Sequence, residues 1–316
     1  MRTRRSSLPL TPQPGAHPGA DHDALRRRPP TGDGDTPGPR THRSGRALFA
    51  LASLGVLVPT AAAAAPAHGD HADRPQITLE AGNDGLTGPA QVAGGFVDFT
   101  VTTEANEIGH SVYIARIADG STAADVAAAG QEALVTMLTF VGGVGTVHDG
   151  ATVGLTLDLE PGNYIAFDNV FLPEPTGVLP FVVGDPATAE YDEAPEAEGT
   201  VQIGPGMLIA PPPDFDGSGT WRFVNGDDTL THEALIVRLP DGIGVPELVA
   251  WGDEGRPEPA PFEAEFAGAG PIGPGEEQWL TLPELEPGNY ALLCYVPFED
   301  GLPHLSDGMI APFTVS

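Results

Sequence analysis

The sequence predicts an all-β protein built from two tandem Greek-key β-sandwich domains, each with one short helix. Glycine and proline are abundant, at 41 and 34 of 316 residues, whereas aromatic residues make up only 7%. This composition favours many short strands joined by turns over long helices. The chain after residue 73 also repeats itself, and each repeat divides into short apolar runs separated by Gly, Pro and Asp. Such runs are typical of a sandwich.

The first 67 residues have the features of an export signal. Residues 1–46 are rich in Pro, Gly and Arg, an apolar segment follows over 47–58, and an alanine run ends at Ala65. This order predicts a signal peptide with a long n-region, cleaved near Ala65 or Ala67. The apolar segment is short for a membrane span, which takes about 20 residues. We therefore expect a secreted, extracytoplasmic mature protein with no stable membrane insertion.

The chain is strongly acidic, with a formal net charge of −30. Beyond His68 it has no lysine, and its basic residues there are Arg74, Arg116, Arg222, Arg238 and Arg256. Such a surface repels phosphate backbones and anionic lipids, so we do not expect nucleic acid or anionic membrane surfaces as partners. Two interpretations remain open. The charge keeps the protein soluble, or it attracts cations or a basic redox partner protein.

Landmarks that recur at an offset of 122 to 126 residues predict two copies of one domain. The motif Leu-Glu-Pro-Gly-Asn-Tyr occurs twice, and so does a strand that contains a histidine. We place the domains at 73–196 and 197–316, each with its own pair of sheets. The acidic stretch 185–198 is assigned to the last strand of the first copy and the linker. The paired landmarks are 159–164 with 285–290, 109–117 with 231–239, 96–101 with 220–224, and 77–79 with 201–203.

One short helix is predicted in each copy, after the strand that contains the histidine. In the first copy the alanine-rich segment 122–133 is suited to a helix, with Ser121 or Thr122 as its N-cap. In the second copy the segment 245–251 predicts a shorter one.

The second occurrence of the repeated motif has the features of a tyrosine corner. Leu285, Gly288 and Tyr290 have the required spacing, and the tyrosine hydroxyl in such a corner bonds back to upstream backbone as a Greek-key strand begins. Side chains alternate between the two faces of a strand, so Tyr290, Leu292 and Cys294 point the same way. Cys294 is therefore expected at the end of a row that faces the core.

Cys294 is the only cysteine, so it cannot form a disulfide within the chain. It is a buried bystander, an intermolecular linker or a metal ligand. A loop rich in Pro, Gly and acidic residues follows it, carries His304 and Met309, and leads into a closing strand at 310–315.

Cys294, His304 and Met309, in this order between the last two strands, resemble the C-terminal signature of cupredoxins, the blue copper proteins of plastocyanin and azurin type. In that family a cysteine thiolate and two histidines bind copper in a trigonal plane, and a methionine sulfur is the weak axial ligand. The other histidine comes from an earlier strand after a turn that often contains Asn or Gly. Asn225-Gly226 before His232 resembles that turn.

The resemblance therefore implies a single type 1 copper ion bound by His232, Cys294, His304 and Met309. Nine residues separate Cys294 from His304. This loop is longer than in the small electron carriers and similar to that of the copper nitrite reductases. The alternative for His232 is a core histidine that bonds to backbone.

The first copy lacks this ligand set. His110 corresponds to His232, but alignment on the tyrosine corners puts Asp168 in the place of Cys294. The same alignment puts Phe181 in the place of His304, and no methionine follows Phe181 before the linker. We interpret the first copy as structural or partner-binding.

Three functions compete. The first is an exported copper protein that transfers electrons by an outer-sphere route, or holds copper. The second is a metal-free binding module at the cell surface, and the third uses Cys294 as a nucleophile with His304 as its base. No His-x-His pair, His-Cys-His run or common hydrolase motif occurs. We therefore predict no enzymatic activity. His68 and His71, near the mature start, are expected to belong to a solvated tail that binds metal only loosely.

Overall fold

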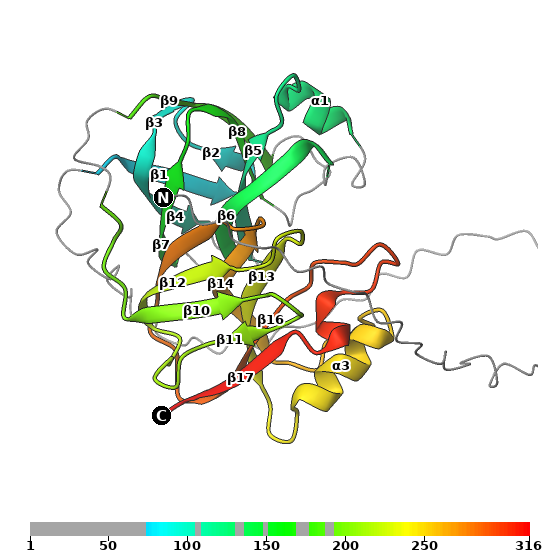
Figure 1. The fold of residues 1–316 in the computed structure, drawn as a ribbon. Coiled ribbons are helices and arrows are strands. Elements are labelled where there is room, and N and C mark those ends of the chain that lie inside the picture. The colour runs from blue at the N-terminus through cyan, green and yellow to red at the C-terminus, as the bar shows by residue number, and fades with distance from the viewer. Residues whose placement is uncertain (1–73, 105–108, 130–135, 148–150, 169–176, 187–192) are drawn as a thin grey trace, which may run out of the picture. The chain divides into compact units, whose positions relative to one another are not determined.

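The computed structural model describes residues 74–316, except 105–108, 130–135, 148–150, 169–176 and 187–192. The predicted signal region therefore lies outside the described residues. Within them, the all-β prediction is confirmed, because two large sheets form the body of the chain (Figure 1). Apolar side chains from both sheets, such as Leu79, Val112 and Trp221, belong to one buried cluster between them.

The two copies contain corresponding strands. Those of the first copy are β1 (Gln76–Gly82), β2 (Gly85–Thr87), β3 (Gln91–Ala93), β4 (Gly95–Thr103), β5 (His110–Ile117), β6 (Leu138–Val147), β7 (Thr152–Leu159), β8 (Gly162–Asp168) and β9 (Val178–Gly184). Those of the second are β10 (Gly199–Ile203), β11 (Ile209–Ala210), β12 (Gly219–Asn225), β13 (His232–Leu239), β14 (Ala264–Ile272), β15 (Glu277–Leu282), β16 (Gly288–Leu293) and β17 (Ile310–Val315). Because β9 ends at Gly184, the assignment of the last strand of the first copy to 185–198 was wrong.

Both sheets run without a break from one copy into the other. One has the strand order β11-β10-β12-β15-β7-β4-β1-β2, and the other has β17-β16-β13-β14-β6-β5-β8-β9-β3. The copies meet where β15 pairs with β7 and β14 pairs with β6, both antiparallel. The expectation that each copy has its own pair of sheets is therefore wrong. Pairing these edges satisfies backbone N–H and C=O groups that an isolated sandwich would leave exposed.

The repeat itself is visible in this order, because corresponding strands lie at equal distances from the junction. β7 and β15 meet at the centre of one sheet, followed outward by β4 and β12, β1 and β10, and β2 and β11. The other sheet is arranged in the same way around β6 and β14, with β3 added at one edge. The two copies are thus related by an approximate two-fold axis.

Both copies contain a tyrosine corner. The Tyr290 hydroxyl donates to the Glu286 carbonyl at 2.8 Å, and the Tyr164 hydroxyl donates to the Glu160 carbonyl at 2.9 Å. Both rings are buried. The corner predicted at Tyr290 is therefore present, with its counterpart at the equivalent place in the first copy.

The last strand of each copy stacks a phenylalanine on this tyrosine. Tyr290 lies opposite Phe313 in the register of β16 and β17, and Tyr164 lies opposite Phe181 in that of β8 and β9. The ring centroids are 5.5 Å apart in both stacks. Phe181 therefore corresponds to Phe313, and its alignment with His304 was wrong.

The helices cover the outer face of the β17-to-β3 sheet. Helix α1 (Ala123–Ala128) begins at Thr122, whose hydroxyl accepts the Asp125 N–H in a capping box. It is shorter than predicted, since Ala129 already has an extended backbone; residues 130–133 lie outside the described part. Helix α3 (Val245–Asp253) extends two residues beyond its predicted end. No helix among the described residues has the length and apolarity to span a membrane.

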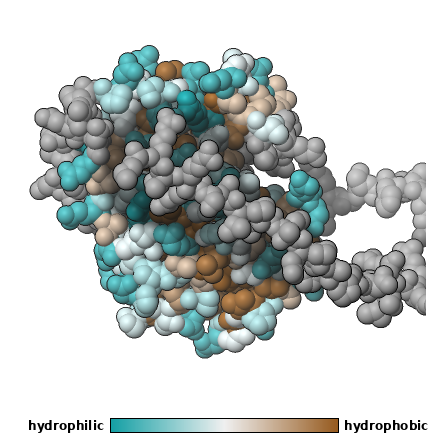
Figure 2. Space-filling view, viewed as in Figure 1, coloured by the Kyte–Doolittle hydropathy of each residue, from teal (hydrophilic) through white to brown (hydrophobic). Residues whose placement is uncertain are grey.

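The surface is mainly hydrophilic. Figure 2 shows polar residues over much of the coloured face, with smaller apolar areas between them. Among the described residues, the large apolar side chains exposed to solvent are Val182 and Leu208.

Candidate metal centre

Three of the four predicted ligands converge at one end of the second copy. The Nδ1 atoms of His232 and His304 are 3.1 Å apart, and the Cys294 sulfur lies 3.5 Å from Nδ1 of His304. One donor atom from each residue falls within 4.8 Å of the others, and all three residues are at most 1% exposed. Among the described residues, no other group of three or more His, Cys, Asp or Glu side chains gathers in this way.

Strand alternation brings Cys294 to this place. Tyr290, Leu292 and Cys294 belong to the core cluster between the sheets, whereas Ala291 and Leu293 belong to the cluster beneath α3. This confirms the predicted facing. Strand β13 pairs with β16 so that Leu235 lies opposite Leu293. The pairing puts the start of β13, where His232 lies, beside the residue that follows β16.

The long loop between Cys294 and His304 is closed on itself. Pro297 and Pro303 form a β-bridge, and the Phe298 N–H donates to the Leu302 carbonyl at 2.8 Å. Beyond this small hairpin, the His304 N–H donates to the Val296 carbonyl at 2.9 Å. The chain therefore returns to Cys294 despite the nine intervening residues.

A short 3-10 helix, η4 (His304–Asp307), carries His304 and packs against α3 (Figure 1). Leu305 of this helix is buried with Leu248 of α3, and its N–H donates to the Cys294 carbonyl at 3.0 Å. The imidazole of His304 also lies against Phe298, with ring centroids 4.4 Å apart. These contacts hold the ring in place from several sides.

Met309, the fourth predicted ligand, is fully buried and belongs to the same apolar cluster as Cys294. Its N–H donates to the His304 carbonyl at 3.3 Å. Gly308 precedes it with φ of +85°, a left-handed conformation that glycine adopts without steric cost. This glycine ends η4 and lets the chain turn directly into β17.

Both histidines are favoured in their neutral form. Burial lowers the pKa of His304 to about 4, and the neighbouring His232 adds to that effect. Burial also lowers the pKa of His232, although Asp227 acts in the opposite direction. A neutral imidazole has one nitrogen free to bind a metal ion, which is the form that metal sites require.

Asp227 is suited to orient His232. Its carboxylate accepts the N–H groups of Thr229 and Leu230 at 2.9 and 3.0 Å, and these bonds lower its pKa to about 2. The other carboxylate oxygen lies 3.6 Å from Nε2 of His232. A carboxylate on this side favours the tautomer that has its proton on Nε2, which directs the Nδ1 lone pair toward His304 and Cys294.

Glu233 supports the cysteine. Its backbone N–H donates to the Cys294 sulfur at 3.5 Å, and its carboxylate accepts the Tyr295 N–H at 2.7 Å. Burial raises the pKa of Glu233 to about 7. Burial also raises the pKa of the Cys294 thiol, and Glu233 adds to that rise. Neither Glu233 nor Asp227 was predicted from the sequence, although a glutamate inside the apolar run of β13 was an available signal.

The first copy has a hydrogen-bonded pair at the equivalent place. His110 Nδ1 lies 2.5 Å from an Asp168 carboxylate oxygen, and the Ser111 N–H donates to the other oxygen at 3.2 Å. This repeats the contact of the Glu233 N–H with Cys294, because Ser111 and Glu233 each follow the histidine. The predicted match of Asp168 with Cys294 is thus seen directly, with a hard carboxylate in place of a soft sulfur.

The second imidazole and the methionine have no counterparts in the first copy. Strand β9 begins ten residues after Asp168, whereas β17 begins sixteen residues after Cys294. The sequence of that shorter segment, 169–177, contains no His, Cys or Met. The predicted loss of these ligands therefore stands, but a shorter loop explains it rather than replacement of His304 by Phe181.

The residues of the second copy fit a metal ion. Two nitrogens each about 2.0–2.1 Å from one tetrahedral ion lie about 3.3 Å apart, and a nitrogen and a thiolate lie about 3.5 Å apart. The separations of 3.1 and 3.5 Å are close to these values. Two imidazoles and a thiolate select a soft or borderline ion, copper or zinc, over magnesium or calcium.

No family model and no curated protein matches this chain. Among solved structures, auracyanin A, a "blue" copper protein from Chloroflexus aurantiacus, is 18% identical in sequence to this chain. The match covers 34% of this chain and 99% of the auracyanin chain, with a TM-score of 0.25. A reduced auracyanin from Roseiflexus castenholzii is 22% identical, covers 38% and 99%, and has a TM-score of 0.24. Copper nitrite reductase from Nitrosomonas europaea is 16% identical, covers 76% and 93%, and has a TM-score of 0.22.

The architecture of this chain can be described from its own features. Two packed β-sheets contain a tyrosine corner in each copy, and a buried cysteine lies with two histidines at the end of the second copy. The chain has a cupredoxin-like fold.

Proposed function

We propose that this is an exported protein that binds one copper ion in its second copy and transfers single electrons or holds copper. The observation that carries the proposal is the buried convergence of His232, Cys294 and His304, with donor separations of 3.1 and 3.5 Å. Bound there, copper supplies a one-electron redox couple.

The protein's own residues have separate tasks in this proposal. His232, Cys294 and His304 would hold the ion, and Met309 would supply a weaker thioether donor. Asp227 orients His232, and the N–H of Glu233 supports the sulfur. The ligands are fixed by strands and by the closed loop before His304, so their positions change little between the two oxidation states. A small change of geometry is what fast outer-sphere transfer requires.

We also propose that the chain acts without catalysis and hands electrons to a separate redox partner protein. Its sequence contains no His-x-His pair or His-Cys-His run that could build a second copper centre. Cys294 is fully buried, which opposes a role as nucleophile because reactive cysteines are partly exposed.

The test is a visible absorption spectrum of the mature protein during titration with Cu(II). We expect an intense blue band that saturates at one equivalent, because thiolate ligation gives strong charge transfer. Excess Zn(II), which is colourless and competes for the same donors, should slow or reduce the appearance of the band when added first. A pale colour alone would indicate nitrogen and oxygen ligation at the tail, and the metal-free binding module would then replace this proposal.

Replacement of Met309 should change the reduction potential more than the colour. Met309→Gln is expected to keep the blue band and to lower the reduction potential, because a harder oxygen donor favours Cu(II) over Cu(I). Spectroelectrochemical titration of both proteins measures this shift. An unchanged or raised potential would show that Met309 is not an axial ligand.

The cleavage site of the predicted signal peptide can be tested separately. The mature chain should begin between residues 66 and 68, after cleavage at the end of the alanine run. Intact-mass analysis of protein collected outside the cytoplasm gives the start directly. Recovery of residues 1–46 on that protein would contradict export by a cleaved signal peptide.

A further inference from the structure

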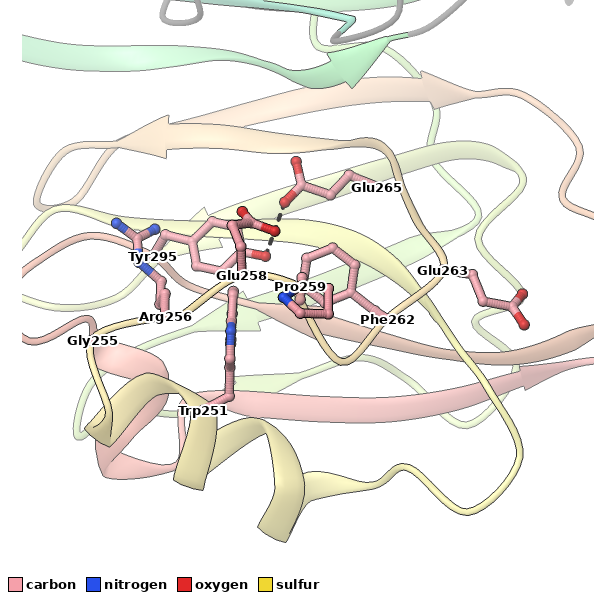
Figure 3. A pocket seen from close by; sticks show the side chains of 10 residues that line it. Trp251, Gly255, Arg256, Glu258, Pro259, Phe262, Glu263, Glu265 and Tyr295 are labelled. Atoms are coloured by element: carbon pink, nitrogen blue, oxygen red, sulfur yellow. Dashed lines mark hydrogen bonds between the residues drawn. The ribbon is translucent and has the colours of Figure 1, made fainter. Parts of the chain in front are cut away.

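A pocket of about 620 Å³ lies next to the candidate metal centre, beside the residue that follows Cys294. It is open to solvent on one side and is lined by helix α3, the loop after it, the start of β14 and Tyr295 (Figure 3). Its volume lies within the range of about 300–1,000 Å³ that is usual for small-molecule sites. The lining residues that matter here are Trp251, Arg256, Glu258, Phe262, Glu265 and Tyr295.

Three aromatic rings form the walls at steep angles to one another. Trp251 and Phe262 have centroids 5.5 Å apart with planes at 88°, and Trp251 and Tyr295 have centroids 6.0 Å apart with planes at 69°. The Trp251 N–H donates to the Pro257 carbonyl at 2.9 Å, which fixes the indole. The walls of the pocket are therefore largely aromatic, and a cation is stabilised over the face of an aromatic ring.

Carboxylates add negative charge beside the rings. Glu265 accepts the Tyr295 hydroxyl at 2.9 Å and the Thr146 hydroxyl at 2.8 Å, so its position is fixed. Glu258 is also among the residues that line the pocket, whereas in Figure 3 Glu263 points away from the other side chains drawn. Glu263 is also paired with Arg238 at 3.4 Å.

A cation from the chain itself already lies in this space. The guanidinium of Arg256 is 5.1 Å from the centroid of the Tyr295 ring. Arg256 is the one basic residue among the lining residues, and it is exposed to solvent. The exposed side chain can leave the ring without opening the core, and its position shows where an external cation would be stabilised.

We propose that this pocket binds a small alkylated ammonium ion as a free solute, which takes the place of the Arg256 guanidinium over Tyr295. An alkylated ammonium ion sheds water at low cost and fits the faces of several rings at once. The two carboxylates supply attraction that an uncharged molecule of the same shape does not experience. Binding of this kind requires no metal, so it stands apart from the copper proposal.

Calorimetric titration of the full chain with choline chloride, without added metal, tests the proposal. 3,3-Dimethylbutan-1-ol, which has the same shape and no charge, is the matched ligand control. We expect saturable choline binding and binding of the alcohol at least about tenfold weaker. No choline binding, or equal binding of the alcohol, would overturn the proposal.

Variants locate the site. Arg256→Ala should bind choline more tightly, because the internal competitor is gone. Arg222→Ala is the matched control, since Arg222 also lies over an aromatic ring, 5.5 Å from the centroid of Trp279, but outside the pocket. It should leave the affinity unchanged. An Arg256→Ala variant with equal or lower affinity would contradict the proposed competition.

Two further variants separate binding from folding. Trp251→Ala should weaken choline binding about 3- to 10-fold. Glu258→Gln, at an exposed position, should weaken it by a few-fold without any change in thermal unfolding. If both variants fold and both keep the full affinity for choline, the ligand binds elsewhere and the assignment is overturned.

Discussion

Cys294→Ser is expected to abolish the blue absorption of the copper-loaded protein completely. The band requires a copper–thiolate bond, and Cys294 is the only cysteine in the chain. A serine hydroxyl is a poor ligand for a soft ion and does not ionise near neutral pH, so two imidazoles would remain as the main donors. The measurement is the visible spectrum at one equivalent of Cu(II), together with the copper content after dialysis.

Two controls give this result its meaning. The His68→Ala/His71→Ala double variant removes imidazoles of the tail, outside the described residues, and should keep the full blue band. Thermal unfolding of metal-free Cys294→Ser shows whether the fold survives, because the serine takes a nearly isosteric place in a buried row. A blue band that persists in Cys294→Ser would refute the proposed ligand set.

Asp168→Ala is expected to lower the free energy of unfolding by about 3 kcal/mol. The substitution removes a fully buried carboxylate, which accepts hydrogen bonds from the His110 ring at 2.5 Å and from the Ser111 N–H at 3.2 Å. A buried donor that loses its acceptor has given up its hydrogen bonds to water and forms no other bond, so its desolvation free energy destabilises the folded state. For a chain of this size the loss corresponds to a fall in melting temperature of about 6–12 °C.

The carboxylate chemistry can be separated from simple loss of volume. Asp168→Asn keeps the shape and one acceptor oxygen, so it should lose about 1 kcal/mol. Asp119→Ala, at an exposed position in the same copy, should change stability by no more than about 0.5 kcal/mol. Denaturant unfolding followed by circular dichroism measures all three. An Asp168→Ala variant as stable as Asp119→Ala would show that the pair contributes nothing to folding.

Features that depend on residues close together in the sequence could be predicted well. The tyrosine corner at Tyr290 depends on residues four apart, and the facing of Leu292 and Cys294 follows from the period of two that every strand has. The cap at Thr122 is likewise local. In each case the physical cause acts between neighbours in the sequence, so the sequence contains all the information needed.

Similar short motifs misled the alignment of the first copy. Leu-Pro-Phe at 179–181 and Leu-Pro-His at 302–304 look alike in sequence. The hydrogen-bond register of β9 against β8 instead puts Phe181 opposite Tyr164, as Phe313 lies opposite Tyr290. A register is fixed by pairing with a second strand and by which face is buried, and neither is contained in a tripeptide.

The all-β class, the repeat, the tyrosine corner and the residue types of the candidate centre could all be predicted from the amino-acid sequence. Three features became visible only in the folded chain: both sheets continue through β7–β15 and β6–β14, the loop before His304 closes on itself, and Asp227 and Glu233 support the ligands. The physical reason is that these features depend on contacts between segments far apart in the chain. A strand edge or a loop has the same local pattern whether or not a partner lies beside it, and burial against that partner selects the arrangement.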